Sequence, residues 1–299
     1  MRRLSVLAFL VLVASPAWAQ GFLTPMGPVA EDQRAHLIRV TALTMIAIVP
    51  VLIGVPLLLW RYRRGRHAAY RPGFEFSAPL EIIMWGVPTA IIIVLGFWLW
   101  QSTHKLDPYR PLGPDPLQVQ VIGLNWKWLF LYPDQGVASI GTLLIPQGRP
   151  VQLKLTTDTV MQSFMVPALA GQIYAMPGMV TDLNLMADAE GEATGRNTQF
   201  NGAGFADQSV TVRAVDDAGW QAWIAQAADA PALDSATYAQ LARPGSTADA
   251  ASALGLPDTR MRLSEPDLFQ TVVHRYHDGQ PLAPDQQPGA PGYQPEAVK

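Results

Sequence analysis

The sequence predicts an α+β membrane protein: a two-helix transmembrane hairpin, then an exported β-sandwich domain and a short helical C-terminal region. Uncharged stretches at 40–60 and 82–101 are each long enough to cross a bilayer core. Short segments with alternating apolar residues follow them, as in antiparallel sheets. Charged residues make up 15% of the chain, below the roughly 25% of soluble domains, so much of it is expected to avoid water.

The composition excludes several kinds of chemistry. The 299 residues include no cysteine, which rules out disulfides, thiolate-ligated zinc, iron–sulfur clusters, a cysteine nucleophile and a cysteine-linked lipid. The formal net charge of −3 gives no reason to expect a nucleic-acid partner.

Residues 1–19 are predicted to be a secretory signal peptide. Two arginines precede an apolar core, Leu4 to Val13, and Ala17-Trp18-Ala19 forms an A-x-A cleavage signal. The alternative is an N-terminal membrane helix, but this core is too short for about 30 Å of hydrocarbon. Residues 20–36 would then be an exported N-terminal segment.

The transmembrane helices are predicted at 37–60 and 80–101, and a soluble core of two buried helices is the disfavoured alternative. Prolines inside them are tolerated in membrane helices. The connecting loop, 61–79, is expected in the cytoplasm because it collects five arginines before its first acid, Glu75: Arg61, Arg63, Arg64, Arg66 and Arg71. Both ends of the mature chain would therefore lie on the exported side.

The exported part begins with a proline-rich linker, 102–116. A β-domain is predicted at 117–216, as a sandwich or small Greek-key barrel, because turn clusters such as Pro133–Gly136 and Pro146–Gly148 separate its apolar segments. The segments that predict strands are Leu117-Val119-Val121, Val151-Leu153-Leu155, Leu183-Leu185 and Val210-Val212.

The pattern changes to alanine-rich helical stretches in a C-terminal arm, 217–278. Trp220, Trp223 and Ile224 fall on one helix face, and Asp234 or Ser235 is a candidate N-cap. The proline-rich tail, 279–299, is expected to be disordered.

Local motifs give this arrangement a family resemblance. Asn125-Trp126-Lys127-Trp128 resembles the tryptophan-rich motif that opens the cupredoxin domain of subunit II of heme-copper respiratory oxidases. Ser163–Pro167 with Gly171–Gly178 resembles that domain's core segment, and Glu81-Ile82-Ile83-Met84-Trp85 resembles the start of the family's second membrane helix. The resemblance covers residues 25–245 and implies a cupredoxin-like sandwich.

One branch of that family holds a binuclear copper site, and this chain lacks its ligands. The family's pattern falls on the following residues: Gln162 and Phe205 for the two histidines, Asn197 and Asn201 for the two cysteines, and Gln208 for the methionine. The histidines of the chain, which all lie outside the β-region, are His36, His67, His104, His274 and His277. We therefore expect no soft-ligand copper cage.

The resemblance that remains is to the quinol-oxidising branch, in which the scaffold persists without metal. Phe200–Phe205 resembles its degenerate copper loop. Relatives often carry a lipidated cysteine after the signal, where this chain has Gln20. No cofactor is expected in this chain, since the resemblance places the hemes, a copper and the quinol site in subunit I. Expected partners are subunit I, small subunits III and IV, ubiquinol and the lipid bilayer of the inner membrane.

Glu81 is the candidate site residue, at the cytoplasmic end of the second span. An acid there is favoured by the positive helix end, by about 0.3–1 kcal/mol. Acids at membrane depth also mark proton paths. The resemblance favours this second interpretation, because the matching glutamate sits at the mouth of a proton channel into subunit I.

Other conspicuous residues have plainer interpretations. Trp126 and Trp128 are expected to pack in the core and at interfaces. His274 and His277 are at helical spacing, but two ligands alone indicate a solvated face rather than a metal site. The arginine cluster is a topology signal that could also contact anionic lipid.

The function this predicts is that of a metal-free subunit II of a proton-translocating ubiquinol oxidase. A cytochrome c oxidase subunit would need the copper ligands. The alternative from a different class is a membrane-anchored periplasmic binding or assembly protein, which would not account for the motifs.

Overall fold

The computed structural model describes residues 21–63, 73, 75–256 and 258–276, which divide into two compact units. One unit is residues 32–107, and the other joins the residues before it to those from Pro108 onwards. The predicted signal peptide, the tail, most of the arginine cluster, His67 and His277 lie outside the described residues.

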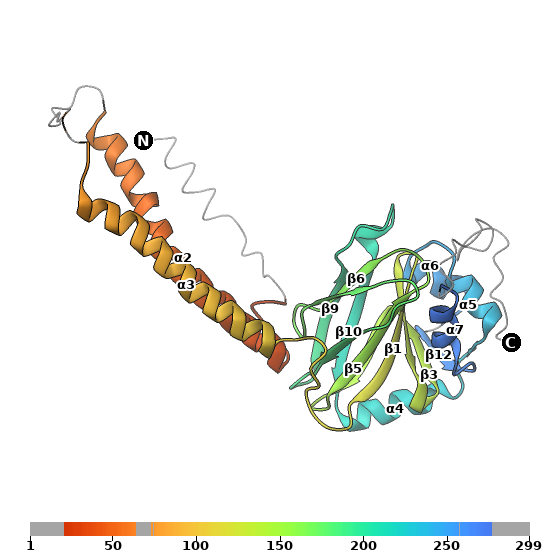
Figure 1. Cartoon of the computed structure of the whole chain (residues 1–299). Helices are drawn as coiled ribbons and strands as arrows, with labels where there is room; N and C mark the ends of the chain where they lie inside the picture. The colour runs from red at the N-terminus through yellow and green to blue at the C-terminus, as the bar shows by residue number, and fades with distance from the viewer. Residues whose placement is uncertain (1–20, 64–72, 74, 257, 277–299) are drawn as a thin grey trace, which may run out of the picture. The chain divides into compact units, whose positions relative to one another are not determined.

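The first unit is an antiparallel pair of long helices, α2 (Pro28–Arg61) and α3 (Ala78–Lys105) (Figure 1). Both are long and apolar enough to cross a membrane, by length and composition. At one end of the pair Ser102 Oγ lies 2.9 Å from His36 Nδ1, and Lys105 Nζ lies 2.7 Å from a carboxylate oxygen of Asp32. The helices contain the predicted spans but run past them, because the polar flanks continue the helical hydrogen bonding.

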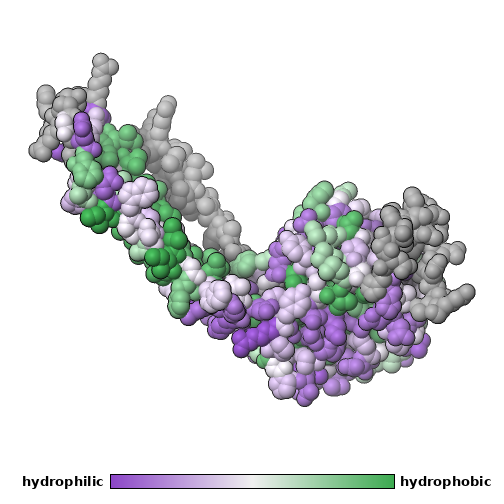
Figure 2. All heavy atoms as spheres, in the orientation of Figure 1, coloured by the Kyte–Doolittle hydropathy of each residue, from purple (hydrophilic) through white to green (hydrophobic). Residues whose placement is uncertain are grey.

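The helices expose apolar side chains that a soluble protein would bury. Leu59 and Ile82 are each 71% exposed, and hydrophobic residues cover much of the helices' visible surface in Figure 2. Such a surface needs lipid or another protein around it. This observation supports the predicted hairpin.

The second unit is built on two sheets that face each other (Figure 1). The seven-stranded sheet has the order β11-β12-β3-β2-β1-β5-β8, and the five-stranded sheet has the order β4-β10-β9-β6-β7. The strands are β1 (Leu117–Leu124), β2 (Lys127–Tyr132), β3 (Val137–Ile140), β4 (Thr142–Pro146), β5 (Val151–Thr157), β6 (Gln162–Met165), β7 (Gln172–Ala175), β8 (Thr181–Leu185), β9 (Gly191–Asn197), β10 (Ser209–Val215), β11 (Ala232–Leu233) and β12 (Arg260–Leu263). All four segments predicted as strands lie in strands.

Alternation along β2 fills two separate cores. Trp128, Phe130 and Tyr132 point between the sheets, whereas Leu129 and Leu131 point to the opposite face. The Tyr132 hydroxyl links the sheets, because it donates to the Leu144 carbonyl and accepts from the Leu144 N–H, both at 2.9 Å.

The C-terminal arm packs on two parts of the sandwich: its first helix lies against the core between the sheets, and its later helices cover the outer face of the larger sheet. Its helices are α4 (Asp217–Ala227), α5 (Ser235–Leu241), α6 (Thr247–Ala253) and α7 (Leu268–His274). Asp234 is the N-cap of α5, since its side chain accepts the Thr237 N–H at 2.8 Å. The description of this arm as helical was incomplete, because β11 and β12 extend the sheet beyond β3 and bury Leu233 and Met261.

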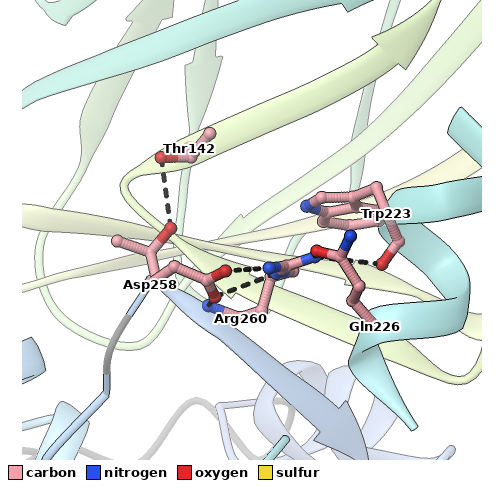
Figure 3. A network of polar contacts seen from close by, with 6 residues as sticks. Thr142, Trp223, Gln226, Asp258 and Arg260 are labelled. Atoms are coloured by element: carbon pink, nitrogen blue, oxygen red, sulfur yellow. Dashed lines mark hydrogen bonds and ion pairs between the residues drawn. The ribbon is translucent and has the colours of Figure 1, made fainter. Parts of the chain in front are cut away.

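A polar network joins two elements of the arm to each other, β12 and α4 (Figure 3). Arg260 on β12 donates from Nη1 to the Gln226 side chain at 2.7 Å and to the Trp223 carbonyl on α4 at 3.3 Å. Asp258 pairs with the same guanidinium, which lowers the pKa of its carboxyl group. Strand β12 and helix α4 are thus held together by side chains as well as by packing.

The residues just before α2 belong to the β-domain. The Met26 N–H donates to the Ala168 carbonyl at 2.7 Å, and the Met26 carbonyl accepts the Asp188 N–H at 2.8 Å. After α3, the Pro108 carbonyl accepts two hydrogen bonds from Asn184, from its backbone N–H at 3.0 Å and its side chain at 2.9 Å. The residues directly before α2 and directly after α3 therefore belong to this domain.

Candidate functional site

Four of the five side chains that the sequence comparison aligned with copper ligands form one hydrogen-bonded cluster, which we call the amide cluster: Gln162, Asn197, Asn201 and Gln208. Gln208 is its centre. Its Nε2 donates to Gln162 Oε1 at 2.6 Å, and its Oε1 accepts Asn197 Nδ2 at 2.9 Å and Asn201 Nδ2 at 2.7 Å. Phe205 is not part of it and packs on Phe200, with ring centroids 5.6 Å apart.

Strand pairing brings these amides together. Gln162 begins β6, Asn197 ends β9, and Gln208 directly precedes β10, which pairs antiparallel with β9. The backbone supplies further partners: Gln162 Nε2 donates to the Leu124 carbonyl at 2.9 Å, and Asn197 Oδ1 accepts the Ser163 N–H at 3.0 Å. Gln162, Asn197 and Gln208 are buried, so these hydrogen bonds satisfy groups that water does not reach.

The amide cluster has little capacity left for a metal. Asn201 Oδ1 is its single buried oxygen without a hydrogen bond among the described residues. The other amide oxygens accept N–H groups, and none of the four side chains is charged or contains sulfur or imidazole. A site for copper needs softer ligands. Among the described residues no group of three or more histidine, aspartate or glutamate side chains is placed to hold a metal ion.

Trp126 covers the loop that carries Asn201. Its indole Nε1 donates to the Asn201 carbonyl at 3.1 Å, and its ring lies against two glycines of the loop, Gly202 and Gly204. A Cβ atom at Gly204 would lie 2.3 Å from the ring. Trp126 holds this position in the left-handed region, with φ of +66°, which is costly for a bulky residue. Trp126 was predicted to pack, and here it packs against this loop and holds it by a hydrogen bond, which we call the Trp126 clamp.

Lys127 is a buried cation that the sequence analysis passed over. Its Nζ donates to the carbonyls of Arg243 at 2.7 Å, Gly245 at 3.0 Å and Asn125 at 3.0 Å, and the side chain is 1% exposed. Burial lowers its pKa to about 8, while the nearby Asp249 carboxylate acts in the opposite direction. A charged residue between two tryptophans indicated that Lys127 could be buried. The sequence could not identify Arg243 and Gly245 as its partners, because they lie so far along the chain.

Asp158 is a second buried charge, placed directly after β5. Its carboxylate accepts hydrogen bonds from the hydroxyls of Tyr238 at 2.6 Å and Tyr276 at 2.9 Å, and it pairs with Arg275 at 2.6 Å. These three partners come from the C-terminal arm. Asp158 therefore anchors that arm to the edge of the sandwich near the amide cluster, since the loop that it begins leads directly to Gln162 on β6.

Glu81 lies in the first turn of α3 and is half-buried. Its Oε2 accepts the indole N–H of Trp85 at 3.2 Å. Glu81 belongs to the helical unit and the amide cluster to the β-domain, so they are two separate candidate sites.

Known proteins resemble the chain along most of its length. Residues 137–215 match the family described as cytochrome c oxidase subunit II, periplasmic domain. The chain is 37% identical to the cytochrome bo(3) ubiquinol oxidase subunit 2 of Pseudomonas putida over 92% of this chain and 86% of that protein. It is 38% identical to the protein of the same name from Pseudomonas aeruginosa, over 85% and 76%.

A relative with a broader name extends the same relationship. The ubiquinol oxidase subunit 2 of Acetobacter aceti is 36% identical over 86% of this chain and 83% of its own length. At this identity and coverage, and with the cupredoxin-like sandwich in place, the chain belongs to the family of ubiquinol oxidase subunit 2.

Proposed function

We propose that this chain is the second subunit of a respiratory complex that oxidises ubiquinol and reduces oxygen to water, and that it carries no redox metal itself. The observation that carries the proposal is the 36–38% identity to ubiquinol oxidase subunits along most of the chain. The amide cluster adds support. Its side chains are neutral amides that hydrogen-bond to one another, and only the oxygen of the Asn201 side chain has no hydrogen bond among the described residues, so few atoms remain to bind a metal.

The hemes and copper that perform the chemistry would then be bound by subunit I, with small subunits III and IV as further neighbours. The two exposed apolar helices are suited to bind such a partner or the inner membrane's lipid. The arginines between the helices support a topology with that loop in the cytoplasm and the β-domain in the periplasm.

Glu81 would serve the complex as a proton-uptake group on the cytoplasmic side. It lies at the end of α3 that follows the arginine-rich loop, where water and the bilayer meet in this topology. A carboxylate there can accept a proton from bulk water and pass it to a path in subunit I. The proton pumping that this path would serve also belongs to the proposal.

Affinity purification of the tagged chain from its native membrane tests the assignment. We expect a heme-bearing, multi-span partner in a fixed ratio to this chain, with ubiquinol oxidase activity, and copper no greater than that partner binds. A chain recovered without heme protein from respiring cells would contradict the proposal and favour a binding protein. A chain found only in incomplete complexes would favour an assembly protein.

The variant Glu81→Gln in the assembled complex tests the proton-uptake role. We expect turnover and proton uptake to fall about tenfold or more, because the amide cannot be a proton acceptor. Glu75→Gln is the matched control, since Glu75 lies just before the same helix, and it should leave both rates unchanged. Equal rates in the two variants would refute the role of Glu81.

A further inference from the structure

Trp85 and Glu81 form a pair along one face of α3. Side chains of a helix incline towards its N-terminal end, so a residue four positions later comes back over the preceding turn. The Trp85 indole does this, and its Nε1 donates to Glu81 Oε2 at 3.2 Å. The contact is local to one helix, so it does not depend on how the two units of the chain are arranged.

The surroundings of the pair are apolar. Trp85 is 72% exposed, and the neighbouring Ile82 and Met84 are also exposed, so a bilayer or a partner subunit would surround them. In such a setting a carboxylate loses most of its hydration, and each remaining hydrogen bond to it is stronger than in water. The indole N–H is a donor only, so it can hold a carboxylate oxygen but can neither take nor pass a proton.

We infer that Trp85 is a positioning residue for proton uptake: its N–H fixes Glu81 Oε2 and leaves Oε1 as the oxygen that exchanges protons. This inference rests on the proposed role of Glu81. A tryptophan at a membrane boundary also serves as an interfacial anchor. The two roles differ in one respect, because an anchor needs the aromatic ring and a positioning residue needs the N–H.

Substitutions at Trp85 in the purified, assembled complex separate these roles. Trp85→Phe keeps the ring and removes the donor, whereas Trp85→Gln removes the ring and keeps an amide N–H at the same spacing. We expect Trp85→Phe to lower kcat and the rate of proton uptake about tenfold, as for one lost hydrogen bond to a charged group, with the KM for ubiquinol unchanged. Trp85→Gln should recover most of that loss.

Trp98→Phe on the same helix is the control for a general effect of losing an indole, and it should behave as the unmodified complex. The heme content per copy of this chain reports assembly of each variant. If the Trp85→Phe complex does not assemble, Trp85→Met takes its place in the comparison, because it removes the same donor.

The double variant Glu81→Gln with Trp85→Phe decides whether Trp85 acts through Glu81. We expect it to be no slower than Glu81→Gln alone. A further loss in the double variant, or unmodified rates in Trp85→Phe beside a slow Glu81→Gln, would overturn the inference and leave the proposed function intact. Unmodified rates in Glu81→Gln would instead overturn the proposed proton-uptake role itself.

Discussion

Trp126 and Lys127 are neighbours in the sequence, yet their side chains fasten different parts of the chain. The Trp126 indole binds the carbonyl of Asn201 in the loop beside the amide cluster, and the Lys127 ammonium group binds the carbonyls of Arg243 and Gly245 in the C-terminal arm. A single turn between β1 and β2 thus holds two segments that are otherwise distant in the sequence.

Gly204→Ala should destabilise the β-domain. The added Cβ would lie 2.3 Å from the rigid Trp126 ring, so the ring or the loop must move, at a cost of about 1–3 kcal/mol. Thermal unfolding of the purified chain in detergent measures the effect. In the background of Trp126→Ala, where the ring is gone, Gly204→Ala should cost much less, and equal costs in both backgrounds would contradict the clamp.

Lys127 should make the stability of the domain depend on alkaline pH. Its pKa is about 8 in the folded chain and 10.5 in the unfolded one, so the unfolded chain binds more protons between these values. The free energy of unfolding should therefore rise with pH from about 8 to 10.5, and this rise should vanish in Lys127→Met.

Lys127→Met should also be less stable than the unmodified chain at neutral pH, because it leaves buried carbonyls unpaired at about 1–3 kcal/mol for each. Lys154→Met is the matched control, since Lys154 lies half-buried on β5 in the same sheet. Identical pH profiles for Lys127→Met and the unmodified chain would show that the cation does not titrate in this range.

Gln208→Leu should be among the most damaging changes in the amide cluster. It removes the donor to Gln162 and the shared acceptor of Asn197 and Asn201 at once, so that each of these three amides loses one hydrogen bond. We expect a loss of several times the roughly 1–3 kcal/mol of one unpaired buried group, measured by chemical denaturation. A loss below about 1 kcal/mol would mean that the cluster contributes little.

Gln208→Glu tests the direction of the central hydrogen bonds. The carboxylate could still accept from Asn197 and Asn201 but would face Gln162 Oε1 without a donor. A protonated carboxyl group restores the donor, so this variant should be more stable in mildly acidic buffer and lose that stability as pH rises. The unmodified chain should show no such loss from this position.

Asp158→Asn should loosen the C-terminal arm. The change leaves Arg275 with a neutral partner at a buried site, which costs about 3–5 kcal/mol when an ion pair is broken from one side. Limited proteolysis should cut the arm of this variant faster than that of the unmodified chain. Adding Arg275→Met should recover part of the resistance, and no recovery would argue against the pair as the cause.

The apolar patterns of the sequence were sufficient for the hairpin and for four of the strands, β1, β5, β8 and β10, since these depend on local patterns. They were insufficient for β11 and β12, because strands as short as Ala232–Leu233 carry almost no periodic signal. The four residues of the amide cluster were singled out only through the family resemblance, as degenerate copper positions together with Phe205, and their mutual hydrogen bonds were not predicted. The contacts of Lys127 with Arg243 and of Asp158 with Arg275 join residues more than a hundred positions apart, and no local pattern reveals such partners.

The position of Met26 sets an order of events during synthesis. Its backbone is hydrogen-bonded to both Ala168 and Asp188, so the stretch ahead of α2 cannot reach its final place until the ribosome has produced the chain through residue 188. This stretch is therefore translated well before the residues that bind it, and its two backbone hydrogen bonds can form only after those partners have been made.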